Sequence, residues 1–265
     1  MPRPITPTPV PGEYPISTGT AKLVADAGEA GSWTLWVNGV PSSHIVIGAP
    51  ERLEFEYMDW IAKILEQVSP APDAVRALHL GAAGCALPRY IEATRPGSRQ
   101  LAVEIDARLA ELVRDWFDVP RAPLVKIRVG DAGQVVRDLP ENRYEIIIRD
   151  AFSAETTPVH LADTAFFEQV LRVAGPNGIY LANVADKPPL KAAKAEIRRL
   201  FEVFEHVIVA AEPAQLKGRR YGNLVAMASA LPLPATEIGR ALRNGAAPAR
   251  VLSGTELQRF CAVPA

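Results

Sequence analysis

Acidic side chains follow several apolar segments of the chain. Glu104, Asp131, Asp150 and Asp186 each stand at the end of such a segment or directly after it. Carboxylates placed in this way can accept hydrogen bonds from ribose hydroxyls or amino groups, and a desolvated one can act as a general base. One such residue alone could equally be a helix N-cap. Their repetition along one edge of a sheet predicts a ligand site.

A glycine-containing turn precedes these acids. The apolar run Ala77–Leu80 leads into Gly81-Ala82-Ala83-Gly84-Cys85, and a helical pattern follows. Glycine allows a sharp turn and close approach to a ligand, and a helix N-terminus offers free N–H groups. Glu104 lies about 20 residues further on, the spacing of a carboxylate that binds ribose hydroxyls in nucleotide-binding βαβ units. The turn and the acid together predict a nucleoside pocket.

Strands and helices must alternate to bring these residues together, and residues 71–230 show that alternation. We expect strands at 75–81, 100–105, 124–129, 144–149, 178–184, 205–211 and 222–229, with helices at 86–94, 107–118, 132–138, 162–173 and 189–202. This predicts an α/β, Rossmann-like domain with a mainly parallel sheet, whose ligands bind at the carboxyl ends of the strands. The last two strands are joined too closely for a crossover helix, so the final strand should be antiparallel. This is the sheet plan of S-adenosylmethionine-dependent methyltransferases.

The two ends of the chain have different patterns. Residues 1–19 are rich in proline and are expected to form a flexible tail. Residues 20–70 predict a small N-terminal β-hairpin domain, with a tight turn at Asn38-Gly39, and an amphipathic linking helix over 51–68. Residues 231–265 predict a helical extension that includes a helix over 253–261.

Composition excludes several classes of function. The net charge is −1 and the basic residues do not gather in a stripe, so nucleic-acid binding has little support. No apolar run reaches the length of a membrane span, and no leader pattern begins the chain. The scattered histidines predict no metal site, and the distant Cys85 and Cys261 suit a reducing cytoplasm. We expect a cytoplasmic protein that acts on small molecules.

These motifs resemble the spermidine synthase (polyamine aminopropyltransferase) family, in its divergent bacterial branch, over about residues 20–230. The similar segments are Leu35–Gly39, Phe55–Asp59, the glycine turn, Val103–Asp106, Gly130–Ala132 and Ile148–Asp150. The resemblance implies transfer of an aminopropyl group from decarboxylated S-adenosylmethionine to a polyamine-type acceptor. It also implies that no cofactor is tightly bound, and by analogy a homodimer.

The resemblance assigns roles to individual residues. Asp150 would be the catalytic acid–base, Glu104 would bind the ribose hydroxyls, and Asp131 with Ala132 would bind the adenine. The donor side would also include Gly81, Gly84 and Asp106. The acceptor amine would meet Tyr57, Asp59, Ser153 and Asp186.

Two cation-binding carboxylates of the family pattern are missing. Gly84 stands where the family has an Asp that binds the amino end of the donor, and Ser153 where it has a second Asp that holds the amine. Each lost charge-assisted contact is worth about 1.5–3 kcal/mol, so we expect little activity on putrescine. Asp186 is a candidate replacement. The alternatives are a methyltransferase that uses S-adenosylmethionine and a nucleoside-binding protein without catalysis.

Several other candidate residues are expected to be structural. Arg149 should point away from Asp150 because strand residues alternate between faces. His79 is expected in the core and Cys85 as a packing residue near the helix start. His160 is expected as a loop or capping residue rather than a base.

Overall fold

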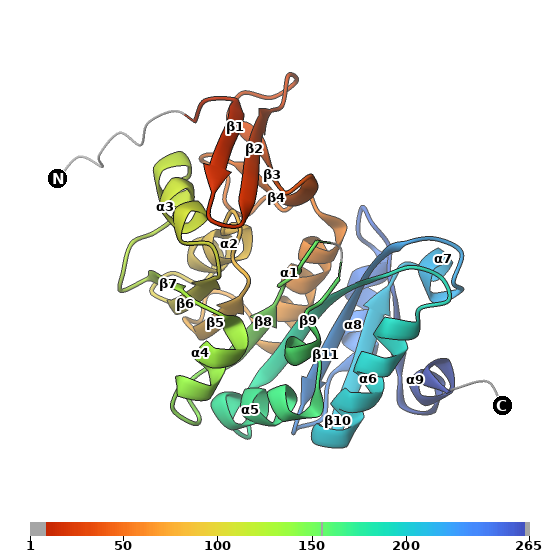
Figure 1. Ribbon diagram of the computed structural model, residues 1–265. Helices are drawn as coiled ribbons and strands as arrows, with labels where there is room; N and C mark the ends of the chain where they lie inside the picture. Colours follow the sequence, from red (N-terminus) through yellow and green to blue (C-terminus); the bar gives the residue numbers. More distant parts are fainter. Residues whose placement is uncertain (1–8, 155, 263–265) are drawn as a thin grey trace.

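The chain folds around two sheets, seen in a computed structural model that describes residues 9–154 and 156–262 (Figure 1). The smaller sheet is antiparallel and has the order β1-β2-β3-β4. Its strands are β1 (Gly12–Ile16), β2 (Gly19–Ala25), β3 (Ser32–Val37) and β4 (Val40–Val46). The expected hairpin joins β3 to β4, and its turn residues Asn38 and Gly39 both have positive φ.

The larger sheet contains eight strands in the order β12-β10-β11-β9-β8-β5-β6-β7. They are β5 (Arg76–Leu80), β6 (Arg99–Glu104), β7 (Val125–Val129), β8 (Ile146–Arg149), β9 (Ile179–Asp186), β10 (His206–Ala211), β11 (Gly222–Ser229) and β12 (Arg250–Ser253). Strands β5 to β9 are parallel, whereas β11 runs antiparallel to both β9 and β10. The strand order reverses beside β5, so the crevice between β5 and β8 is the switch point of the sheet.

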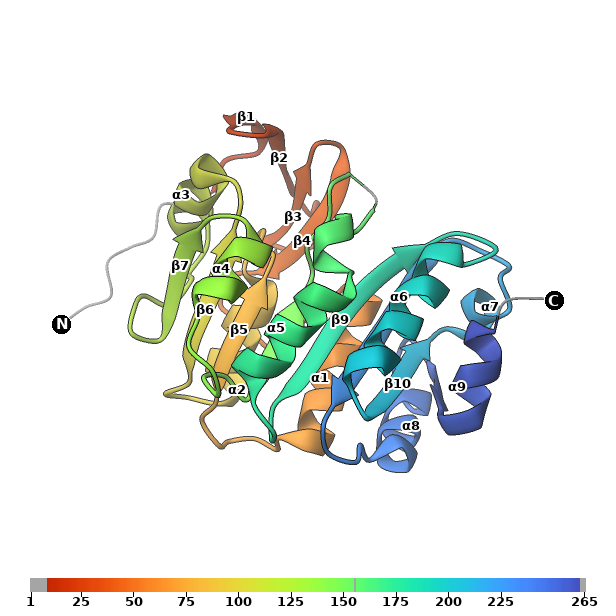
Figure 2. The same ribbon diagram turned by 60° about the horizontal axis from the view of Figure 1, so that its bottom comes forward.

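Helices cover both faces of the large sheet. They are α1 (Glu56–Val68), α2 (Ala86–Thr94), α3 (Ala107–Trp116), α4 (Ala132–Asp138), α5 (Thr164–Ala174), α6 (Lys191–Val203), α7 (Pro213–Leu216), α8 (Ala235–Arg243) and α9 (Gly254–Cys261), with a 3-10 turn η1 (Val159–Leu161). Figure 2 shows α4, α5 and α6 in front of the sheet and α1 behind it. No helix of the described residues is long and apolar enough to cross a bilayer.

The alternation of strand residues separates two cores. Ile146 and Ile148 of β8 pack with α1, α2 and the N-terminal sheet, whereas Ile147 packs with α4, α5 and α6. Each face of the sheet is therefore closed by its own layer. The N-terminal sheet joins the first layer and contacts α2 through β4 and α3 through β1, which places it over the carboxyl ends of β5 and β6.

Three details outside the central strands differ from the expectations, although helices α8 and α9 form in the C-terminal extension as expected. Residues 12–16 form strand β1 rather than part of a flexible tail, because Tyr14 packs edge-on against Trp116 with the ring centroids 4.9 Å apart; residues 1–8 lie outside the described part of the chain. The linking helix begins at Glu56, not at residue 51. The C-terminal extension includes strand β12, which pairs with β10 and adds an antiparallel edge to the sheet.

Candidate functional site

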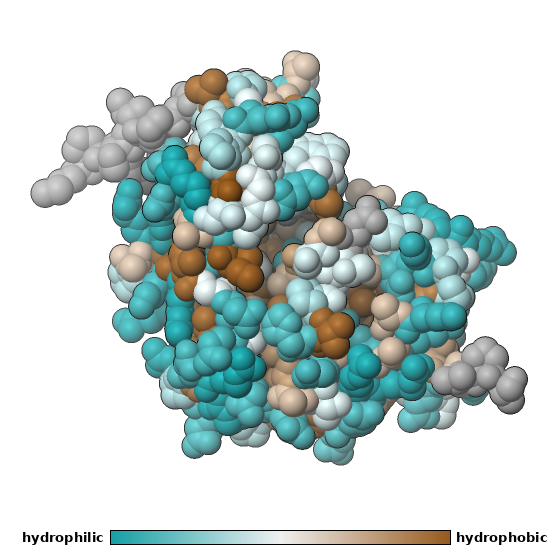
Figure 3. All heavy atoms as spheres, viewed as in Figure 1, coloured by the Kyte–Doolittle hydropathy of each residue, from teal (hydrophilic) through white to brown (hydrophobic). Residues whose placement is uncertain are grey.

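A narrow pocket lies at the switch point, between the glycine turn, α1 and strand β4. Ser43, Met58, His79, Gly81 and Asp150 are among the residues that line it. Figure 3 shows the surface hollowed below the N-terminal sheet, with hydrophobic residues bordering the recess. Of the described residues that line the pocket, Asp150 is the one acid, and burial lowers the pKa of His79 to about 4, so this histidine is neutral.

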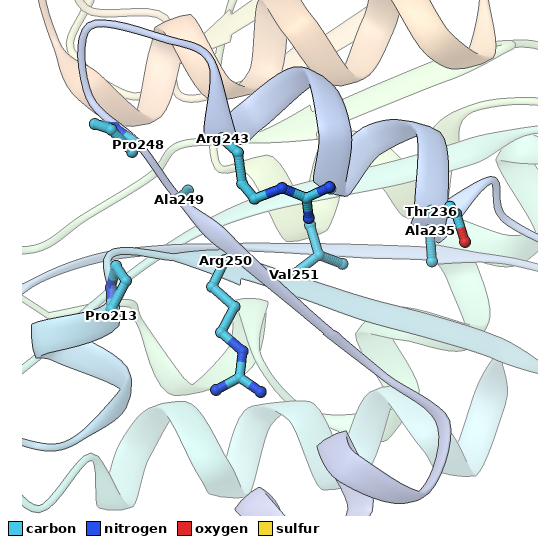
Figure 4. A pocket seen from close by; sticks show the side chains of 9 residues that line it. Pro213, Ala235, Thr236, Arg243, Pro248, Ala249, Arg250 and Val251 are labelled. Carbon is cyan, nitrogen blue, oxygen red and sulfur yellow. The ribbon is translucent and has the colours of Figure 1, made fainter.

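A larger cavity of about 510 Å³ lies elsewhere, between α8 and the edge strand β12. Its lining includes Arg243 and Arg250, whose side chains extend in different directions in Figure 4. Arg250 is paired with Glu256. Because its polar groups do not converge and none of the predicted site residues lines it, the larger cavity is not the candidate site.

The Asp150 carboxylate is held from two elements. The Tyr57 hydroxyl on α1 donates to Oδ2 at 2.8 Å, and the Asn183 side-chain amide on β9 donates to Oδ1 at 2.9 Å. Asp150 follows directly after β8, whose last residue Arg149 is in register with Ala182. Asp150 therefore lies level with Asn183, and both point toward α1.

The electrostatics of this group suit a general base. Burial raises the pKa of Asp150, while the hydrogen bonds from Asn183 and Tyr57 and the charge of Arg149 oppose the rise. Burial and the charge of Asp150 raise the pKa of Tyr57 well above its usual value, so this phenol remains a donor. A half-buried carboxylate with a raised pKa is more basic than an exposed one and stays fixed in one orientation.

Asn183 is a site residue that the sequence analysis did not identify. Its side chain is 2% exposed, and its Oδ1 has no hydrogen-bond partner in the described part of the chain. A buried acceptor without a donor costs free energy unless a ligand or water satisfies it. The signal available in the sequence was its place one strand beyond Asp150, since the carboxyl ends of adjacent parallel strands meet.

The backbone amides of the glycine turn hold the Glu104 carboxylate. Glu104 accepts hydrogen bonds from the backbone amides of Ala83 at 2.9 Å, Ala82 at 3.4 Å and Asp106 at 3.1 Å. Burial raises the pKa of Glu104, and these three bonds oppose the rise. Gly81 is required for the close approach, because its φ is +89° and a Cβ there would lie 2.3 Å from the carbonyl oxygen of Asp150.

Asp131 caps helix α4 at the end of the neighbouring strand. Its Oδ1 accepts from the amide of Gln134 at 2.9 Å, and its Oδ2 is bonded to Nε2 of His160 at 2.8 Å. Burial would raise the pKa of Asp131, but the bonds from Gln134 and His160 outweigh it and lower the pKa. Ala132 follows as the first residue of α4.

Position 84 is filled from the N-terminal sheet. The Gly84 amide donates to Oγ of Ser43 at 3.0 Å, and a Cβ at residue 84 would lie 2.7 Å from Cβ of Ser43. The serine thus occupies the space that a side chain at position 84 would need.

Four of the predicted site residues make contacts that serve other parts of the fold, and none of these contacts involves Asp150. Asp106 caps α3 and accepts from the amides of Ser17 and Thr18, which ties it to the β1–β2 turn. Asp59 lies two residues from Tyr57 on the helix, faces away from it and pairs with Lys63. Their assigned ligand roles stay predictions, without a contact that supports them.

The other two are Asp186 and Ser153, which the resemblance assigns to the acceptor amine. Asp186 accepts from the amides of Lys187 and Ala193 and so fastens the start of α6. Successive strand residues point to opposite faces of a sheet, and Asp186 is three positions from Asn183 on β9. Asp186 therefore points to the face opposite to that of Asn183. Ser153 is exposed in the loop after β8, where its backbone pairs with that of Thr156.

Arg149 lies on the reverse face, as expected. Its guanidinium is fully buried, forms an ion pair with Glu196 of α6, and donates to Tyr180 at 3.0 Å and to Thr157 at 2.8 Å. Through the bond to Thr157, this network fixes the loop that follows Asp150, on the face of the sheet opposite to the pocket.

The expectations for the core residues were also confirmed. His79 is buried and bonded to Gln100 at 2.9 Å. Burial raises the pKa of Cys85 to about 12, so this thiol is a packing residue. Among residues 9–154 and 156–262 no group of three or more His, Cys, Asp or Glu side chains is placed to hold a metal ion.

Several known proteins are similar to this chain in sequence and fold. The chain is similar to a crystal structure of a probable spermidine synthase from Corynebacterium glutamicum, with 41% identity, a TM-score of 0.90, and coverage of 96% of this chain and 95% of that one. A polyamine aminopropyltransferase of Neisseria meningitidis is 24% identical over 81% of this chain and 78% of its own. A match to the enzyme of the same name from Vibrio vulnificus, 25% identical over 48% of this chain, spans 43% of that protein.

The likeness to a methyltransferase structure is one of fold alone. A crystal structure of human methyltransferase-like protein 13 in complex with SAH is 20% identical, with a TM-score of 0.57 over 79% of this chain and 92% of that one. No protein-family model matches the chain.

Proposed function

Since the chain belongs to the spermidine synthase family, we propose that it transfers an aminopropyl group from decarboxylated S-adenosylmethionine to an acceptor amine, with Asp150 as the general base. The observation that carries the proposal is the Asp150 carboxylate, held by Tyr57 and Asn183 beside the glycine turn. Its position allows a donor bound along the turn to meet an amine bound against α1.

The reaction needs alignment and one proton acceptor. The amine nitrogen attacks the aminopropyl methylene that is bonded to the sulfonium, a new C–N bond forms, and the C–S bond breaks. The sulfur keeps the electron pair of that bond, so methylthioadenosine leaves as a neutral thioether. The nitrogen loses a proton to the Asp150 carboxylate. Alignment of the two substrates supplies most of the acceleration, and the base contributes roughly 10²–10⁴-fold.

The nucleoside would bind along the strand ends next to Asp150. Glu104 would accept from the ribose hydroxyls, and Asp131 with the start of α4 at Ala132 would bind the adenine edge. Ile105 and Val129 lie at the same strand ends and are 64% and 49% exposed. Exposed apolar side chains beside a carboxylate suit a planar base that needs both a stacking surface and a polar contact.

The acceptor site carries less negative charge than a polyamine site requires. Asp150 has one neutral neighbour on each side, Tyr57 and Asn183, and the unpaired Oδ1 of Asn183 can accept from the attacking amine. With Ser153 exposed in its loop and Asp186 on the opposite face, neither adds a contact to a second ammonium group. We therefore expect an amine with a single cationic centre near Asp150 to be a better acceptor than putrescine.

The test is a donor comparison. The protein is incubated with an amine panel and either decarboxylated S-adenosylmethionine or S-adenosylmethionine, and the products are identified by mass spectrometry. The proposal expects aminopropylated amine and methylthioadenosine in equal amounts from the first donor. Methylated product and S-adenosylhomocysteine from the second donor alone would favour a methyltransferase. The homodimer and the cytoplasmic location expected from the sequence stay predictions.

A further inference from the structure

His160 fixes the orientation of the Asp131 carboxylate from a different segment of the chain. It lies on η1, in the connection from β8 to α5, and its Nε2 is 2.8 Å from Oδ2 of Asp131. The amide of Gln134 holds the other oxygen at 2.9 Å. With one partner on each oxygen, the plane of the carboxylate is set and each oxygen keeps a lone pair for a further donor.

The local packing places His160 there. A Cβ on Gly133 would lie 3.1 Å from Cδ2 of His160 and 3.3 Å from Cδ2 of Leu161, so the missing side chain at position 133 gives the imidazole room against α4. Leu161 is 3% exposed and anchors η1 in the core. The imidazole is therefore a positioned group, although half of its surface faces solvent.

We propose that His160 is a positioning residue for nucleobase recognition, which holds Asp131 so that its free lone pairs meet the exocyclic amino group of adenine. The inference rests on the proposed nucleoside site. The Asp131 side chain is 36% exposed, so a ligand can reach it.

The Asp131–His160 pair favours a nucleobase that presents a hydrogen-bond donor. An ionised carboxylate only accepts hydrogen bonds, and the low pKa of Asp131, to which the bonds from Gln134 and His160 contribute, keeps it ionised. The amino group of adenine donates, whereas hypoxanthine presents a carbonyl oxygen at the same place, so acceptor would face acceptor. A freely rotating carboxylate would lose part of this preference, because it could turn away from the carbonyl.

The experiment measures base selectivity by isothermal titration calorimetry. Affinities for 5′-methylthioadenosine and 5′-methylthioinosine are compared in the wild type, His160→Ala and His160→Gln. Glutamine can place an N–H near the position of Nε2 and serves as the conservative variant. His206→Ala is the matched control, because His206 is also a partly exposed histidine near a carboxylate, 3.9 Å from Glu205.

We expect the wild type to prefer the adenosine ligand and His160→Ala to lose about fivefold of that preference, the effect of one average hydrogen bond. His160→Gln should keep most of the preference, and His206→Ala should keep all of it. An equal loss of affinity for both ligands in His160→Ala, or no change, would overturn the inference.

Asp131→Asn separates the inference from the proposed function. If the wild type binds the adenosine ligand and Asp131→Asn keeps the preference, Asp131 does not contact the base, and the inference is wrong while the Asp150 chemistry stands. If the wild type binds neither nucleoside, the proposed function fails together with the inference.

Discussion

The amide of Gly84 donates to Oγ of Ser43 across the boundary between the two sheets, at 3.0 Å. The backbone at Gly84 does not have a positive φ, so any residue could adopt its conformation. What excludes a side chain there is Ser43, whose Cβ would lie 2.7 Å from a new Cβ. The space beside position 84, where the resemblance implies an acid, is thus occupied by Ser43 of β4.

Gly84→Asp alone should therefore destabilise the protein and fail to raise activity, because an overpacked site typically costs about 1–3 kcal/mol. Gly84→Asp combined with Ser43→Gly removes the obstructing side chain. The double variant should recover stability and bind decarboxylated S-adenosylmethionine about tenfold to a hundredfold more tightly, through one charge-assisted contact. Urea denaturation and calorimetry measure both effects. A single variant as stable as the wild type would show that Ser43 is free to move.

Glu104 is predicted to be required for nucleoside binding and also to support the turn. Glu104→Gln keeps the volume but loses the charge, so methylthioadenosine should bind at least about tenfold more weakly. Its amide nitrogen cannot accept from the backbone amides that one carboxylate oxygen now holds, so we also expect some loss of stability, smaller than in Glu104→Ala. Glu104→Ala leaves the amides of Ala82, Ala83 and Asp106 without their acceptor and should also cost about 1–3 kcal/mol of unfolding free energy. Calorimetry and urea denaturation separate the two effects. Unchanged affinity in Glu104→Gln would remove this residue from the nucleoside site.

Tyr57 is predicted to set the pH dependence of the rate. The base acts when Asp150 is deprotonated, so a raised pKa makes the rate fall as the pH drops through that pKa. The hydrogen bond from the Tyr57 hydroxyl favours the charged form. Tyr57→Phe removes this bond but keeps the burial, which should raise the pKa of Asp150 further and move the acid limb of kcat to higher pH. A limb that moves to lower pH, or does not move, contradicts the assignment.

The contributions of Arg149 and Glu196 to the free energy of unfolding are predicted to be coupled. Arg149 is fully buried and Glu196 is 3% exposed. Arg149→Met leaves a buried carboxylate without its partner and should cost about 3–5 kcal/mol at neutral pH. Arg149→Met with Glu196→Leu removes both charges and should recover most of that loss. Urea denaturation of the three proteins tests this, and a double variant no more stable than the single one would refute the coupling.

The sequence predicted the parts of this fold that depend on local pattern. Apolar runs separated by helical patterns placed β5 to β11, and Asn38-Gly39 placed the β3–β4 hairpin, because these signals lie within a few neighbouring residues. Strands β1 and β12 were missed, since their stability comes from partners far away in the chain. Tyr14 packs on Trp116, and β12 pairs with β10.

The candidate site also has features that local sequence pattern predicts and features that depend on distant parts of the chain. The place of Asp150 and Glu104 at strand ends follows from the strand pattern. The partners of Asp150, Asn183 and Tyr57, come from two other elements, so their convergence depends on register and helix packing. Asp59 and Asp186 show the converse, because both are close in sequence to site residues yet face away from them.

Asp150→Asn tests the central claim most directly, because asparagine keeps the shape of the side chain and removes the base. The measurement is the rate of methylthioadenosine release from decarboxylated S-adenosylmethionine, with the best acceptor from the amine panel, alongside calorimetry with methylthioadenosine. We predict a rate lower by roughly 10²–10⁴-fold and an almost unchanged nucleoside affinity. Full activity in Asp150→Asn would contradict the account and move the proton acceptor to another residue.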